Sequence, residues 1–105
     1  MAQPSVIELK GRIDNVTSAA IETSINSALD GMPLALILDF AEVTFVSSIG
    51  LRVLLTAAKR CRKQNTKLLL HSISPQILDL FAVSGLKTFF PIYSSREDAL
   101  AVLSS

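Results

Sequence analysis

Residues 34–64 read LALILDFAEVTFVSSIGLRVLLTAAKRCRKQ. The apolar run Leu34–Asp39 has no polar alternation, which is typical of a strand buried on both faces of a parallel sheet. After a short connection, apolar side chains recur with helical spacing and form one stripe: Leu51, Leu54, Leu55, Ala58 and Cys61. A buried strand followed by an amphipathic helix is the repeating unit of α/β proteins, so this segment predicts an α/β fold.

Two serines, Ser47 and Ser48, stand where the predicted connection becomes the predicted helix. Serine side chains at such a position accept hydrogen bonds from free backbone N–H groups, and each such cap contributes about 1 kcal/mol. The same N–H groups favour a negatively charged group nearby. Capping is therefore the structural interpretation of both residues.

The segments around this unit continue the alternation of strands and helices. Ser5–Ile13 alternates apolar and charged side chains, which predicts a strand with one face open to water. Because the chain starts just before Ser5, we expect this strand to be an exposed edge of the sheet. A helical stripe follows, and Gly31 is its expected end: Ile21, Ile25, Ala28 and Leu29.

The C-terminal part of the chain predicts two more strands and two more helices. Lys67–His71 is a short apolar strand, and Ser74 caps a helix that ends at Gly85. Thr88–Tyr93 predicts a last strand, which Pro91 confines to a sheet edge. Ser95 starts the final helix.

The composition bounds the kind of protein. The 105 residues are half hydrophobic with a formal net charge of +1, which predicts one folded domain spanning 1–105. One cysteine, no secretory signal and no apolar stretch of membrane-spanning length predict a soluble cytoplasmic protein. Neither a nucleophile–base pair nor a metal-ligand set is apparent, so we expect no enzyme, cofactor or metal.

Cationic residues gather in and after the predicted helix, and a nucleic-acid-binding protein would use such a cluster to contact phosphates: Arg52, Lys59, Arg60, Arg62, Lys63 and Lys67. No aromatic residues are interleaved with these charges as base-stacking surfaces would require. The cluster is therefore interpreted as a solvated helix face, and no nucleic acid is expected as a partner.

The other side of the same helix is a candidate docking surface. Ile49, Val53 and Thr56 fall near one line, and arginines flank them, which suits a protein interface. Two interpretations of Val53 stay open: it lies in this interface, or it packs within its own domain.

The segment from Asp39 to Leu51 resembles the signature of the STAS family, the sulphate-transporter and anti-sigma-factor-antagonist domains. The spacing from Phe45 to Gly50 matches without a gap, and Ser48 falls on the family's phosphorylated Ser or Thr. Ser47 replaces the usual Asp, and Ile49 replaces a small polar residue. The resemblance implies a small fold with a mixed, mostly parallel sheet of about four strands and about four helices.

The same resemblance implies a bacterial anti-sigma factor antagonist. Such a protein binds an anti-sigma factor that is also a serine kinase, phosphorylation of Ser48 ends the binding, and a PP2C-type serine phosphatase resets it. The expected partner-binding residues lie around the helix start: Ser47, Ser48, Ile49, Gly50, Arg52, Val53 and Thr56. Gly50 is expected to let the partner approach closely.

Two alternatives remain open at this point. The first is the stand-alone STAS subunit of a membrane-lipid ABC transporter, a structural interaction module that uses the same helix. The second is an antagonist that binds its partner without being switched.

Overall fold

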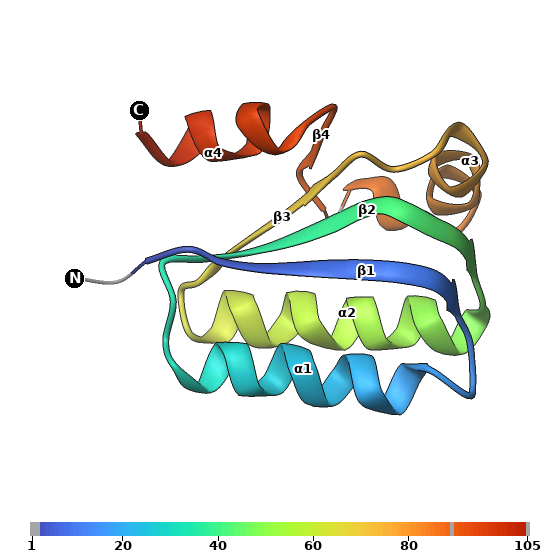
Figure 1. The fold of residues 1–105 in the computed structure, drawn as a ribbon, viewed down its shortest axis with the longest axis horizontal. Coiled ribbons are helices and arrows are strands. Elements are labelled where there is room, and N and C mark those ends of the chain that lie inside the picture. The colour runs from blue at the N-terminus through green and yellow to red at the C-terminus, as the bar shows by residue number, and fades with distance from the viewer. Residues whose placement is uncertain (1–2, 89, 105) are drawn as a thin grey trace.

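The computed structural model describes residues 3–88 and 90–104 (Figure 1). The elements follow in the order β1 (Ser5–Ile13), α1 (Ser18–Asp30), β2 (Ala35–Val46), α2 (Ser48–Lys63), β3 (Lys67–His71), α3 (Pro75–Val83), the 3-10 helix η1 (Leu86–Thr88), β4 (Ile92–Tyr93) and α4 (Arg96–Ser104). The strands lie in the order β1-β2-β3-β4, and each neighbouring pair is parallel. The predicted α/β class is confirmed, and β1 forms one edge of the described sheet.

Helices cover both faces of this sheet. In Figure 1, α1 and α2 lie side by side under one face and α4 lies over the other. Alternate residues of β2 follow this division: Leu36, Leu38 and Phe40 join the main core, whereas Ile37 belongs to the smaller cluster under α4. Because β2 is buried on both faces, it reads as an uninterrupted apolar run.

The central strand is longer than its apolar run. We expected it to end at Asp39, but β2 continues to Val46. Its pairing with β1 has register shifts between Glu8 and Lys10 and between Gly11 and Arg12, and at each shift β2 carries one more residue than β1. These irregularities interrupt the two-residue alternation of side chains in the second half of β2. Exposed polar residues also occur there, so the sequence of this half resembles that of a loop.

The start signals of the C-terminal elements are confirmed. The Ser74 hydroxyl caps α3, accepting from the Ile77 N–H at 3.4 Å, and Gly85 follows the helix at a φ of 78°. The Ser95 hydroxyl accepts from the Asp98 N–H at 3.1 Å at the start of α4. The last strand covers only Ile92–Tyr93 of its predicted range. Thr88, the first residue of that range, is the last residue of η1, and residue 89 lies outside the described residues.

Polar contacts hold the outer layers to this frame. On one side, an Arg96 guanidinium nitrogen lies 3.0 Å from Asp39 Oδ2, which joins α4 to β2. On the other, an Arg60 guanidinium nitrogen lies 2.6 Å from Asp30 Oδ1, which joins α2 to α1. Within residues 3–88 and 90–104, no helix has the length and apolar character needed to cross a membrane.

Candidate partner-binding site

Ser47 fixes the start of α2 to the sheet. Its hydroxyl accepts a hydrogen bond from the Gly50 N–H at 3.1 Å, and its carbonyl accepts from the Leu51 N–H at 2.9 Å. Its own N–H donates to the Ile13 carbonyl at 2.8 Å, at the end of β1. Ser47 is therefore the N-cap of the helix, and its polar groups are used within the domain.

Ser48 is the first residue of α2, and its side chain is exposed. No hydrogen bond to its hydroxyl is found in the part of the chain that the structure describes. The prediction that both serines cap the helix is right for Ser47 and wrong for Ser48, since one hydroxyl occupies the N-cap position. The Ser48 hydroxyl is therefore exposed to solvent.

The electrostatic setting of Ser48 favours added negative charge. The first turn of α2 contains no acidic residue. Helix N-termini carry about half a positive charge from their free N–H groups, and phosphate groups bind at such ends. A phosphate on Ser48 would therefore meet a favourable field from its own helix.

Gly50 faces the inside of the domain, which corrects the expectation that it lets a partner approach. The residue is buried. A Cβ atom at this position would lie 2.8 Å from both Cγ2 and the carbonyl oxygen of Ile13, and 3.0 Å from Cγ1 of Val46. The absence of a side chain allows α2 to lie against the ends of β1 and β2, so Gly50 serves packing within the chain.

Val53 also faces inward. Its side chain is 7% exposed and belongs to the main core. Its inclusion among the partner-binding residues was wrong, and the second of the two open interpretations holds. The reason is that α2 packs against both the sheet and α1 (Figure 1), so its buried face is wider than a single stripe.

The remaining candidates form an exposed side of the helix. Ile49, Arg52 and Thr56 are exposed, and their spacing of three and four residues places them on one side of α2 together with Ser48. Ile49 is 41% exposed, which is substantial for a large apolar side chain.

The sequence interpretation did not single out two exposed side chains that precede α2, Phe45 and Arg12. Phe45, near the end of β2, is 41% exposed, and the Arg12 guanidinium carbon lies 4.3 Å from its ring centroid. The position of Phe45 two residues before Ser47 was the available signal, because the register shift beside Phe45 could not be inferred from the sequence pattern. We call Phe45, Ser48, Ile49, Arg52 and Thr56 the outer surface.

The other chemically versatile side chains are engaged elsewhere. His71 is buried, with Nδ1 2.8 Å from the Ser72 hydroxyl and 3.9 Å from Asp39 Oδ1. Among the described residues, no group of three His, Cys, Asp or Glu side chains could hold a metal ion. The arrangement offers an exposed hydroxyl on the same helix side as exposed apolar and cationic side chains.

The structure thus combines a parallel sheet, covered by helices on both faces, with an exposed serine in the first turn of α2. The family model for the STAS domain matches residues 2–99, and the chain belongs to this family.

Individual relatives extend the likeness over most of the chain. BtrV of Bordetella bronchiseptica is 30% identical over 97 residues, which cover 92% of this chain and 84% of BtrV. The anti-sigma-F factor antagonist RsfB of Mycobacterium tuberculosis is 29% identical over 96 residues, covering 91% of this chain and 78% of RsfB. The crystal structure of an anti-sigma factor antagonist from Mycobacterium paratuberculosis superposes with a TM-score of 0.88 at 28% identity, covering 100% of this chain and 89% of that one.

Proposed function

We propose that this protein is an anti-sigma factor antagonist that binds an anti-sigma factor with serine kinase activity, and that phosphorylation of Ser48 ends the binding. The observation that carries the proposal is that the two neighbouring serines have different roles. Ser47 is used as the helix cap, whereas the neighbouring hydroxyl is exposed in the first turn of α2. The names of similar proteins also favour an antagonist over a transporter subunit.

The departure of Ser47 from the family's usual Asp leaves this mechanism intact. An Asp side chain at the N-cap would accept a hydrogen bond from the helix N–H groups, and Ser47 accepts such a bond from Gly50. What the replacement removes is a negative charge next to Ser48. The phosphate therefore experiences less repulsion here than it would beside a carboxylate.

Phosphorylation would change the surface and leave the fold in place. A phosphoserine adds about −1.5 to −2 charges, which the N-terminus of α2 stabilises. In a complex the same charge would have to lose its water, and without a cation on the partner this costs several kcal/mol. The phosphate would thus act on the docked partner, which lies over the outer surface.

The domain is the ligand and the substrate in this cycle, and the chemistry belongs to its partners. The kinase supplies ATP and magnesium, and a PP2C-type serine phosphatase removes the phosphate. The protein itself needs no metal or cofactor, and it works in the cytoplasm, where the transcription machinery is found.

A phosphorylation assay with two matched variants tests the proposal. A pull-down from native lysate with and without ATP identifies the cognate kinase, which is then incubated with wild type, Ser47→Ala and Ser48→Ala. We expect one phosphate on wild type and on Ser47→Ala, and none on Ser48→Ala. A phosphate mapped only to Ser47, or no phosphate in the presence of a demonstrated partner kinase, would contradict the proposal.

A further inference from the structure

The strand β1 is an open edge of the sheet (Figure 1). It pairs with β2 on one side, and within residues 3–88 and 90–104 no strand lies on its other side. An edge strand leaves backbone N–H and C=O groups without a partner in the sheet, and such an edge can pair with a strand of another chain. With nine residues, β1 offers a long edge for such pairing.

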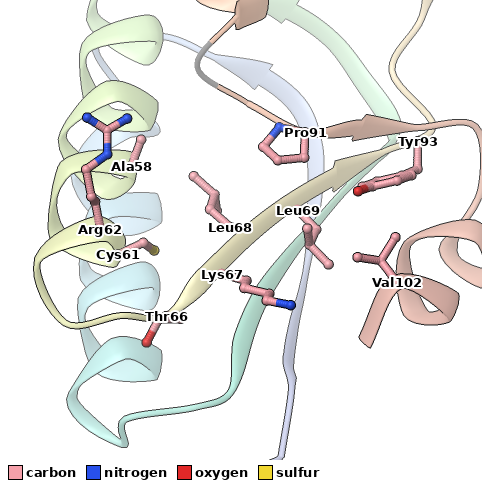
Figure 2. Close-up of a pocket in the computed structure, with 10 residues that line it drawn as sticks. All are labelled: Ala58, Cys61, Arg62, Thr66, Lys67, Leu68, Leu69, Pro91, Tyr93 and Val102. Carbon is pink, nitrogen blue, oxygen red and sulfur yellow. The ribbon is translucent and has the colours of Figure 1, made fainter. Parts of the chain in front are cut away.

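The opposite edge of the sheet is better protected. The strand β4 has only two residues, Ile92–Tyr93, and it follows Pro91, which has no backbone N–H to donate. Figure 2 shows Pro91 and Tyr93 beside β3, with Val102 of α4 near the same edge. Short edge strands and prolines prevent pairing with other chains. The edge that remains open to a further strand is therefore β1.

An open groove runs along this edge, between β1 and α1, and its volume is about 330 Å³. Half-buried Ile7 and Ile21 line it, together with Val16, which is 80% exposed in the turn before α1. On the side of α1 the lining includes the small, exposed side chains of Ala20 and Ser24. The groove thus presents apolar surface beside unpaired backbone, and small side chains leave room for a neighbouring chain.

Two opposite charges accompany this edge. The side chains of Glu8 and Lys10 are 61% and 68% exposed. Each has a neighbour within the chain, since Glu8 Oε2 lies 3.6 Å from an Arg96 nitrogen and Lys10 Nζ lies 4.0 Å from Glu42 Oε2. Ion pairs this exposed contribute little, so neither contact prevents pairing with a further charge.

The order of these charges makes the edge complementary to itself. When two copies of β1 pair antiparallel with Leu9 opposite Leu9, Glu8 of each copy lies opposite Lys10 of the other, and Ile7 lies opposite Gly11. A shift that sets Glu8 opposite Glu8, or Lys10 opposite Lys10, brings like charges together. A shift by a single residue places the core sides of the two copies on opposite faces. Of these registers, the first alone joins opposite charges and keeps both cores on one face.

We propose that two copies of this chain associate through β1 into a symmetric dimer with one continuous sheet. The second copy is the occupant of the groove, because the charges of the edge complement themselves about a twofold axis at Leu9. The same axis brings the two grooves and the two α1 helices together on one side of the sheet. This association is independent of the proposed phosphorylation of Ser48.

Sedimentation velocity of the full chain, from about 1 μM to about 1 mM, tests the dimer. We expect a monomer–dimer equilibrium. Glu8→Lys and Lys10→Glu should each raise its Kd at least about tenfold, because each sets like charges opposite each other twice in the dimer. The double variant restores opposite charges and should return to within about threefold of wild type. Glu22→Lys makes the same change of net charge on α1, outside the groove, and should leave the Kd unchanged.

A second matched pair tests the groove itself. Ala20→Glu places a carboxylate in the groove and should weaken dimerisation at least about tenfold. Ala19→Glu makes the same change at the neighbouring exposed residue, outside the lining, and should dimerise like wild type. Melting curves check that every variant is folded. A chain that stays monomeric up to about 1 mM would overturn the proposal. So would a dimer that tolerates the single variants, or one that the double charge reversal does not restore.

Discussion

The first turns of α2 have an inner side that packs within the domain and an outer side that faces solvent. Residues next to each other in the sequence lie on different sides. On the inner side, Ser47 caps the helix, Gly50 allows close contact with Ile13, and Val53 enters the core. On the outer side, Ser48 and Ile49 are exposed. A signature motif can therefore contain both residues that hold the fold and residues that face solvent. Their positions around the helix axis distinguish the two groups.

This division would allow the proposed phosphorylation of Ser48 to leave the nearby buried contacts in place. The hydrogen bonds and packing that hold α2 to β1 and β2 pass through the inner residues. A new charge on the outer side leaves these contacts unchanged.

The largest loss of stability is expected on the inner side at Gly50. Overpacking a core site costs about 1–3 kcal/mol and occasionally more. Gly50→Val would force side-chain atoms against the backbone of Ile13, so we expect a loss of about 3 kcal/mol or more in the free energy of unfolding. Urea unfolding measures this loss.

Thr56→Val is the matched control, because it places the same side chain on the outer side of α2. It should change the free energy of unfolding by no more than about 0.5 kcal/mol. If Gly50→Val were as stable as this control, the inner assignment of Gly50 would be wrong.

Much of this fold could be predicted from local signals. The strand Lys67–His71 and the helix that begins after Ser74 were predicted correctly, because their periodicity and caps depend on neighbouring residues. The second half of β2 could not be predicted, because its bulges depend on pairing with β1.

The candidate site was predicted only in part for a similar reason. The sequence placed Ser48 and Ile49 at the surface, where the structure has them, but it left open whether Val53 lies in an interface or in the core. A stripe of leucines shows that a helix packs on a sheet, yet it does not show that a second helix packs beside it. Burial of Val53 depends on that tertiary arrangement.

Val53→Ala and Ile49→Ala should also differ in stability, but by less than Gly50→Val and its control. The first removes two buried carbon groups at about 0.8 kcal/mol each, so we expect a loss of about 1.6 kcal/mol in stability. The second truncates an exposed side chain and should cost less than about 0.5 kcal/mol while weakening partner binding. Thermal unfolding measures the stability of both variants, and a binding titration measures their affinity for the partner. If both variants lost stability equally, or both lost affinity equally, the assignment of Val53 to the inner side and Ile49 to the outer side would be contradicted.

The smallest expected losses of stability are those of the two serine variants, and they should differ from each other. Ser47→Ala removes the helix cap and should lower the free energy of unfolding by about 1 kcal/mol. Ser48→Ala removes an exposed hydroxyl and should lower it by less than about 0.5 kcal/mol. Equal losses, measured by urea unfolding, would mean that both hydroxyls contribute to the cap.

The central claim is that negative charge at Ser48 releases the partner without unfolding the domain. Calorimetric titration of the cognate anti-sigma factor with wild type, Ser48→Ala and Ser48→Asp tests it most directly, with Ser27→Asp on exposed α1 as the charge control. We predict that Ser48→Ala and Ser27→Asp bind like wild type, whereas Ser48→Asp binds at least about tenfold more weakly with an unchanged melting curve. If the folded Ser48→Asp binds as tightly as wild type, the claim is contradicted.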